Sequence, residues 1–135
     1  MQYVFTRVLI KDTDNNILVV QDRASIWNFP GGKLESNETP IECAKREVKE
    51  EVGLYVSELN EIIHKDIYFE NKKWHGYFYL ATSVSGSPTL NEFDKIKGIQ
   101  FVNNFEKVKF PLELSSITKE IFSSPSFQEK KTIWY

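Results

Sequence analysis

The segment from Gly32 to Leu54 constrains this chain most, because it joins a glycine turn to a helix whose two ends are both marked. Thr39 is a good N-cap, Pro40 suits the first helical position, and Glu42 completes a capping box with the threonine. Gly53 is the expected helix stop, since glycine readily adopts the left-handed conformation that ends many helices. The sequence therefore predicts a helix that begins at Pro40 and ends before Gly53.

This helix has an apolar face and an acidic face. At about 100° per residue, one side carries Ile41, Ala44, Val48 and Val52, a stripe that should pack on a core. Beside it lies an arc of three carboxylates, Glu47, Glu50 and Glu51. Carboxylates so close repel one another, whereas a hard divalent cation with oxygen ligands would offset that repulsion. The carboxylates alone leave open a solvated acidic face, with counter-charges at Lys45, Arg46 and Lys49.

The spacing of the whole segment favours the cation. Five residues separate Gly32 from Glu38, and seven more precede the pair Arg46–Glu47. An aliphatic residue, a free position, two glutamates, another free position, a glycine and an aliphatic residue then follow, up to Leu54. These nine specified positions in 23 residues resemble the Nudix box without a departure. The preceding residues 27–32, Trp-Asn-Phe-Pro-Gly-Gly, are similar to the lead-in of MutT-like members.

The resemblance implies a Mg²⁺-dependent hydrolase that cleaves a phosphoanhydride bond, with Mn²⁺ as an alternative ion. It makes Glu47 and Glu51 the principal metal ligands, and Glu50 a further ligand or the base that activates water. A backbone carbonyl of Gly31 or Gly32 would complete the metal shell.

The resemblance also assigns supporting roles. Arg46 is similar to the family arginine that holds these carboxylates in register, which is compatible with an i,i+4 pairing to Glu50 or Glu42 on the helix surface. Glu38 is similar to the structural glutamate that helps fix the glycine loop. Some members take the base from a later loop, and Glu92 or Asp94 could supply it here.

The box specifies a diphosphate linkage and leaves its substituent open. A nucleoside triphosphate, cleaved to monophosphate and pyrophosphate, is the best single expectation from the MutT-like lead-in; nucleotide sugars, ADP-ribose and diadenosine polyphosphates stay open. The guanidinium of Arg23 could bind two phosphate oxygens of the substrate, or Arg23 could be a solvated loop charge. Asn28 could bond a base edge or cap a turn. Candidates for stacking on a base are Phe29, Tyr68, Phe69, Trp74, Tyr77 and Tyr79, each of which could instead be a core residue.

Composition narrows the class of protein. With 135 residues, 41% of them hydrophobic, residues 1–135 suit a single domain with an adequate core. A formal net charge of −2 shows no basic excess for a nucleic-acid polymer or an anionic membrane. No signal-peptide pattern and no long apolar run are present, so a cytoplasmic location is the default expectation. Cys43 is interpreted as a structural filler, and His64 and His75 as strand residues outside any metal motif.

The remaining pattern predicts an α/β fold. Residues 3–10 and 17–20 read as strands of a hairpin, 74–83 as a strand with one polar-capable face, 98–102 as a short strand and 111–122 as a second helix. The tail, residues 127–135, could pack across the domain, join a homodimer or fray. Short hairpin links indicate a mixed sheet, and the resemblance makes it the Nudix fold, a curved mixed β-sheet sandwiched between α-helices. A second function class is a non-catalytic nucleotide sensor on the same fold.

Overall fold

The structure of the protein, a computed structural model, describes residues 3–92, 94–104 and 108–135. Two sheets form among these residues. The larger has strand order β4-β1-β6-β5, with β8 also paired to β6, and the smaller has order β3-β2-β7. The elements are β1 (Tyr3–Leu9), β2 (Ile17–Asp22), β3 (Trp27–Asn28), β4 (Gly31–Lys33), α1 (Pro40–Val52), β5 (Tyr55–Phe69), β6 (Lys72–Ser85), β7 (Ile96–Val102), the 3-10 turn η2 (Leu112–Leu114), α2 (Ser115–Ser123), α3 (Pro125–Glu129) and β8 (Ile133–Trp134).

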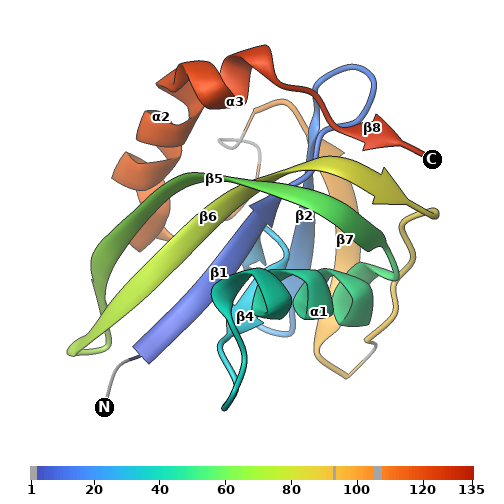
Figure 1. Ribbon diagram of the computed structural model, residues 1–135. Coiled ribbons are helices and arrows are strands. Elements are labelled where there is room, and N and C mark those ends of the chain that lie inside the picture. Colours follow the sequence, from blue (N-terminus) through green and yellow to red (C-terminus); the bar gives the residue numbers. More distant parts are fainter. Residues whose placement is uncertain (1–2, 93, 105–107) are drawn as a thin grey trace.

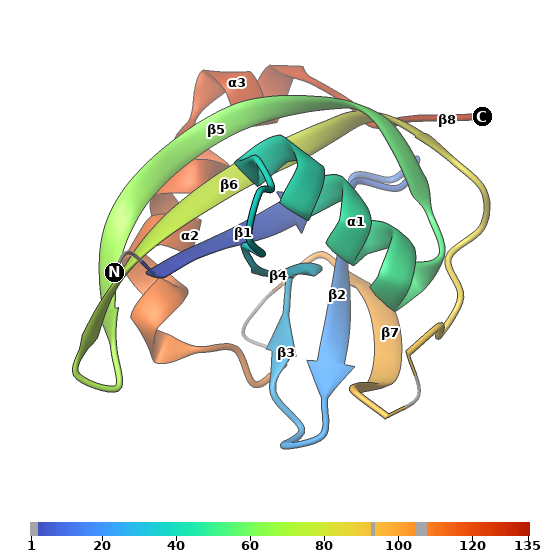
Figure 2. The ribbon, with the colours of Figure 1, turned by 60° about the horizontal axis from the view of Figure 1, so that its bottom comes forward.

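The larger sheet is mixed, as predicted. β1 runs parallel to β6 and antiparallel to β4, and β5 and β6 form a long antiparallel hairpin. That hairpin curves around the rest of the molecule, with α1 on one side of the sheet and α2 and α3 on the other (Figures 1 and 2). The expected sandwich of a curved mixed sheet between helices is therefore confirmed, with the smaller sheet as an addition that the sequence did not indicate.

Side chains alternate between the two faces of a β-strand, so the larger sheet contributes to two hydrophobic clusters, one on each face. Val8, Tyr79 and Ala81 pack under α1, whereas Leu9, Phe78 and Leu80 belong to the opposite core beneath α2. The predicted alternation of β6 is correct. Helix α1 covers the polar-capable face of β6 at Tyr79 and Ala81. Nearer the start of β6 this face is partly open, and there His64 Nδ1 on β5 lies 3.0 Å from His75 Nε2 on β6.

The hairpin predicted for the first two strands is only partly right. The turn exists, with a bridge between Lys11 and Ile17, but β1 and β2 then diverge into different sheets. Each finds longer partners elsewhere: β1 pairs with seven residues of β6, and β2 pairs with β7. The helix predicted over 111–122 also differs, because the 3-10 turn η2 precedes α2, and a further short helix, α3, begins at Pro125.

Helix α1 forms as its sequence signals require. Thr39 and Glu42 make the reciprocal capping box, and Gly53 ends the helix at φ 70°, with its N–H donating to the Lys49 carbonyl. The apolar stripe is buried at Ala44, Val48 and Val52, but Ile41 is 46% exposed. Ile41 lies in the first turn of the helix, at its N-terminal end.

The C-terminal tail packs across the fold. β8 pairs in parallel with β6 at Ser83 and Val84. The Thr132 hydroxyl donates to the Ala81 carbonyl (2.6 Å) and accepts from the Lys11 N–H (2.9 Å), and the Lys11 ammonium donates to the carbonyls of Phe127 and Lys130.

Among the described helices, none has both the length and the apolar character that crossing a membrane requires.

Replacing Thr132 tests how much this packing stabilises the protein. Thr132→Val keeps the side-chain shape but leaves a buried N–H and a carbonyl without partners, which should lower the free energy of unfolding by about 1–3 kcal/mol. Urea denaturation measures the change, with Thr13→Val, in an exposed turn, as the matched control. Equal stability of the two variants would show that the tail is not anchored through this hydroxyl.

Candidate functional site

Two adjacent glycines allow the carboxylates of α1 to approach the sheet. A Cβ at Gly31 would lie 1.9 Å from the Thr6 carbonyl oxygen, and its φ of +152° is itself unfavourable for other residues. A Cβ at Gly32 would lie 2.6 Å from the carboxylate of Glu47. Glu47 and Glu51 are consequently buried, at 4% and 3% exposure, although they are charged residues on a helix.

Glu51 lies deepest in the site. Its Oε1 accepts a hydrogen bond from the Gly31 N–H at 2.9 Å. Burial raises the pKa of Glu51 to about 7, because desolvation outweighs the opposing effects of that hydrogen bond and of the cations Arg7 and Lys95. A cation bound nearby would favour the ionised carboxylate, and the proton would be released to solvent.

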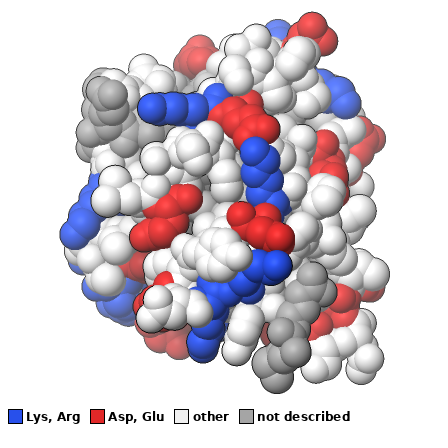
Figure 3. Space-filling view, turned by 90° about the vertical axis from the view of Figure 1, so that its left-hand side faces the viewer, with Lys and Arg blue, Asp and Glu red and all other residues white. Residues whose placement is uncertain are grey.

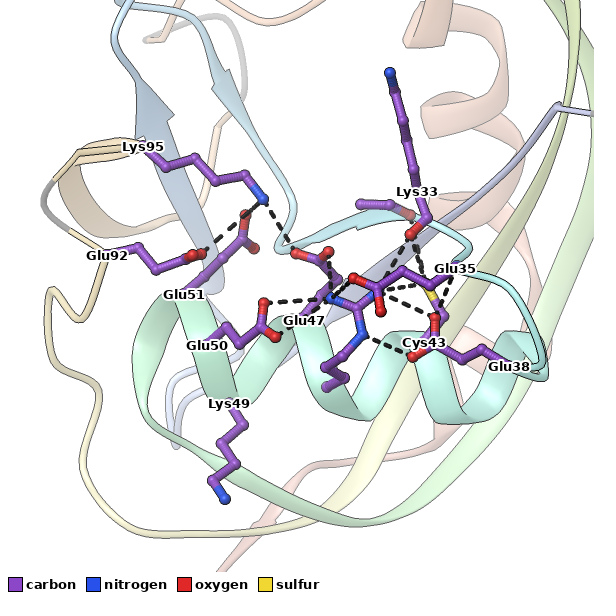
Figure 4. Close-up of polar contacts among 12 residues, drawn as sticks. Lys33, Glu35, Glu38, Cys43, Glu47, Lys49, Glu50, Glu51, Glu92 and Lys95 are labelled. Atoms are coloured by element: carbon purple, nitrogen blue, oxygen red, sulfur yellow. Dashed lines mark hydrogen bonds and ion pairs between the residues drawn. The ribbon is translucent and has the colours of Figure 1, made fainter.

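Lys95 lies among these acidic groups (Figure 4). Its Nζ is 3.3 Å from Glu47 Oε2, 3.9 Å from Glu51 Oε2 and 4.0 Å from Glu92 Oε1. The acidic field raises the pKa of Lys95 against the effect of burial. From the sequence, only the carboxylates of this loop were predicted to belong to the site, and Lys95, the residue after Asp94, was not.

Arg46 connects the helix to the glycine loop. It bonds Glu38 at 2.6 Å, Glu47 at 2.9 Å and Glu50 at 3.3 Å, and it donates to the Lys33 carbonyl at 3.2 Å. These contacts lower the pKa of Glu38 and raise that of Arg46. Glu38 in turn accepts from the Glu35 N–H at 3.0 Å. The arrangement fixes the glycine loop against the helix.

Lys49 was also expected as a counter-charge to these carboxylates. Its side chain points away from them (Figure 4), and its Nζ lies over the ring of Tyr55.

The loop before β7 brings a fourth carboxylate to the helix. Asn91 Nδ2 donates to the carbonyls of Lys49 (3.3 Å) and Glu50 (3.1 Å), which holds the loop on the C-terminal turn of α1. As a result, carboxylate oxygens of Glu47, Glu50 and Glu92 lie within 4.8 Å of one another.

This trio fits a divalent cation. Glu92 Oε1 is buried and has no hydrogen-bond partner among the described residues; its nearest cation is Lys95 at 4.0 Å. Burial, with the nearby acidic groups, raises the pKa of Glu92. Hard oxygen ligands gathered around an oxygen that lacks a donor are the environment that Mg²⁺ or Mn²⁺ satisfies.

Two hollows adjoin these groups. One, of about 440 Å³, has a wall that includes the charged side chains of Asp22, Glu47, Glu51 and Lys95. The other, of about 210 Å³, is mostly apolar and includes Ile67, Phe69, Trp74, Glu113 and Leu114. Arg7, Asn28, Gly32 and Lys33 line both hollows, so the two adjoin. We call them the acidic hollow and the apolar hollow.

The structure places only some of the predicted substrate-binding residues beside the hollows. Asn28 lines both hollows, and its Oδ1 accepts from the Phe29 N–H at 2.8 Å. Phe29 itself is fully buried in the core, so no base can stack on it, and that prediction is wrong. Arg23 lines neither hollow; it is exposed, and its Nε donates to the Asp94 carbonyl at 3.2 Å. Arg7, a half-buried arginine that was not predicted as a site residue, lines both hollows instead.

Comparison with known proteins identifies the family. The sequence matches the NUDIX domain over residues 3–122. The chain belongs to the Nudix family. It is 42% identical over 98 residues to the 8-oxo-dGTP diphosphatase of Proteus vulgaris, covering 67% of this chain and 80% of that protein. It is 30% identical over 142 residues to the oxidized purine nucleoside triphosphate hydrolase of Mus musculus, covering 96% and 90%.

The fold of a solved structure agrees with this membership. The MutT NUDIX hydrolase of Burkholderia pseudomallei superimposes with a TM-score of 0.75 at 23% identity, covering 93% of this Nudix chain and 98% of that one. Other relatives are longer than the shared part: this chain spans 53% of an 8-oxo-dGTP diphosphatase from Buchnera aphidicola and 10% of the mRNA-decapping enzyme subunit 2 of Saccharomyces cerevisiae.

The raised pKa of Glu51 predicts a pH-dependent stability. Because its folded pKa of about 7 exceeds the ordinary 4.5, the protonated carboxyl favours the folded state, and this stabilisation is lost as the pH rises from about 4.5 through 7. At about 1.4 kcal/mol per tenfold change in proton affinity, the loss is on the order of 3 kcal/mol. Glu51→Gln should therefore be more stable than the parent at pH 8 in EDTA, with little difference at pH 5.

Urea denaturation at the two pH values measures this, with Glu50→Gln on the same helical turn but more exposed as the control. A Glu51→Gln variant that is no more stable than the parent at pH 8 would contradict the assignment of burial as the dominant cause.

Proposed function

We propose that this protein hydrolyses a phosphoanhydride bond in a nucleoside diphosphate-linked compound with Mg²⁺, most readily converting a nucleoside triphosphate to its monophosphate and pyrophosphate. The observation that carries the proposal is the approach of Glu47, Glu50 and Glu92 within 4.8 Å beside the acidic hollow. A bound ion would neutralise phosphate oxygens and acidify water, and Mn²⁺ could substitute.

The protein residues have separable tasks in this proposal. Glu47, Glu50 and Glu92 offer oxygens to the ion, and either Glu50 or Glu92 also acts as the base that takes a proton from water. Glu51, hydrogen-bonded to Gly31, adds a deeper carboxylate as a ligand. The Gly31 carbonyl, which accepts a long hydrogen bond of 3.4 Å from Arg7 Nη1, can supply a further oxygen. Arg46 orients Glu47 and Glu50 without touching substrate. Lys95, next to these carboxylates, is placed to attract the substrate's phosphates.

The substrate class follows from the second hollow and from the relatives. When a diphosphate lies against the carboxylates, the adjoining apolar hollow, with Phe69 and Trp74 in its wall, is where a nucleobase can stack. The relatives named for oxidised purine triphosphates support a nucleoside triphosphate with a purine base. Lysine and arginine side chains are interspersed with acidic ones on the face shown in Figure 3, which fits a small substrate better than a nucleic-acid polymer.

A panel of nucleotides tests the reaction. Nucleoside triphosphates, including 8-oxo-purine forms, nucleotide sugars, ADP-ribose and diadenosine polyphosphates are incubated with Mg²⁺ and, in parallel, with EDTA. Pyrophosphate release from a triphosphate, abolished by EDTA, is the expected result. Tight nucleotide binding without turnover of any compound would show a sensor in place of an enzyme.

Glutamine variants separate the base from the ligands. Loss of the base should lower kcat by about 10²–10⁴-fold at saturating Mg²⁺. Loss of a ligand should instead raise the Mg²⁺ concentration needed for half-maximal rate. We expect Glu50→Gln or Glu92→Gln to show the first behaviour, and Glu47→Gln the second. Near-parental rates for both Glu50→Gln and Glu92→Gln would exclude both residues as the base.

A further inference from the structure

Two histidines that are distant in the chain meet on the β5–β6 hairpin. His64 and His75 stand 11 residues apart, outside any local metal-binding motif. The pairing of the strands puts His64 opposite Tyr77 and Asp66 opposite His75, so the two histidines are diagonal neighbours on one face of the sheet. His64 Nδ1 lies 3.0 Å from His75 Nε2. His64 is exposed and 19% of the His75 side chain is exposed, so both rings can be reached from solvent.

A carboxylate orients one of the two rings. Asp66 Oδ1 lies 2.8 Å from His75 Nδ1, and this hydrogen bond lowers the pKa of Asp66. Because an ionised carboxylate can only accept hydrogen bonds, the proton is on His75 Nδ1, and in the neutral ring Nε2 presents its lone pair toward His64. Histidines that bind metals in proteins almost always donate their other ring N–H to a carboxylate, a carbonyl or water in this way.

An aromatic side chain holds both rings in place. The Tyr77 ring stacks on His64 with centroids 5.5 Å apart, and it meets His75 edge-on with centroids 5.0 Å apart. Tyr79, which is buried under α1, stacks with Tyr77 in turn, with centroids 6.3 Å apart. The imidazoles are therefore packed before a ligand arrives, which lowers the entropy lost on binding.

The spacing of the two nitrogens suits one transition-metal ion. Two nitrogens bound at about 2.0–2.1 Å to the same ion lie about 2.9 Å apart at a right angle and about 3.3 Å apart at the tetrahedral angle. The observed 3.0 Å is closer to the right angle, which is the ligand angle in tetragonal Cu²⁺ and Ni²⁺ sites. Imidazole suits these ions, whereas Mg²⁺ requires oxygen ligands, so this pair differs in chemistry from the carboxylates of α1.

Metal binding at this pair requires only that one proton change place. In the metal-free protein His75 Nε2 accepts, so His64 donates from Nδ1. Exchange with solvent moves that proton to His64 Nε2, and the exposed His64 ring then turns its free Nδ1 lone pair toward the ion, while both rings stay neutral. The neighbouring lysines leave the pair accessible, because Lys73 Nζ lies 3.7 Å from the other Asp66 oxygen, Oδ2, and Lys65 pairs with Glu120 of α2.

We propose that His64 and His75 form a binding site for Cu²⁺ or Ni²⁺ on the β5–β6 hairpin, with Asp66 as a positioning residue for His75 and with water completing the coordination. The site is independent of the proposed hydrolysis, because neither histidine lines the acidic or the apolar hollow. An ion held here joins β5 to β6 beside the stretch of hairpin that brings Ile67 and Trp74 into the wall of the apolar hollow.

The test is calorimetric titration of the untagged protein with Ni²⁺ in excess Mg²⁺, which competes for the carboxylates of α1, followed by electron paramagnetic resonance with Cu²⁺. We expect one Ni²⁺ per chain and Cu²⁺ hyperfine splitting from two imidazole nitrogens. Asp66→Asn should weaken Ni²⁺ binding roughly 10- to 100-fold, because it removes the carboxylate that orients His75. His64→Gln and His75→Gln should each weaken it further. Glu70→Gln, an exposed carboxylate in the turn of the same hairpin, is the control.

Four results would contradict the proposal. The site would be excluded if the parent protein bound no Ni²⁺, or if His64→Gln and His75→Gln bound it as tightly as the parent. A Cu²⁺ spectrum with a single nitrogen would overturn the pairing of the histidines, and equal affinities of Asp66→Asn and Glu70→Gln would overturn the role of Asp66. Because His64 is exposed, His64→Gln decides the question even if His75→Gln fails to fold, and circular dichroism checks the fold of each variant.

Discussion

The close approach of helix α1 to the glycine loop governs the rest of this structure. Two carboxylates, Glu47 and Glu51, are pressed against Gly31 and Gly32, where a single Cβ would collide with the peptide backbone or with Glu47 itself. Desolvation of these charges opposes folding, and the protein offsets it with the Gly31 N–H, with Arg46, and with Lys95. The site therefore stores acidic charge that a divalent cation can stabilise better than the protein alone.

Each of the two sheets positions a different part of the site around this contact. The larger sheet supplies β1 and β4, which fix the glycine loop, and the smaller sheet supplies β7, whose preceding loop carries Glu92 and Lys95. Strand alternation on β1 directs Thr6 toward Cys43 of α1 and Arg7 toward the hollows. Cys43 is buried in this contact, and burial raises the pKa of its thiol, which agrees with its interpretation as a packing residue.

Prediction succeeded where interactions are local. The sequence correctly predicted the capping box, the helix stop at Gly53 and the burial of Ala44, Val48 and Val52. These features depend on residues within one or two helical turns. Prediction failed where distant segments decide. Phe29 was a candidate for stacking on a base, with a core position as the alternative, and it packs in the core against Phe110. Ile41 was expected in the buried stripe, but it is 46% exposed.

The sequence by itself determined the helix, the spacing of its glutamates and the glycines in front of it, since these are set by helical geometry and backbone sterics. Only the tertiary structure decided that Glu92 joins Glu47 and Glu50, that Lys95 lies among them, and that Arg7 forms the wall between two hollows. Those groups come from segments far apart in the chain, and their meeting depends on strand pairing and packing that no local pattern encodes.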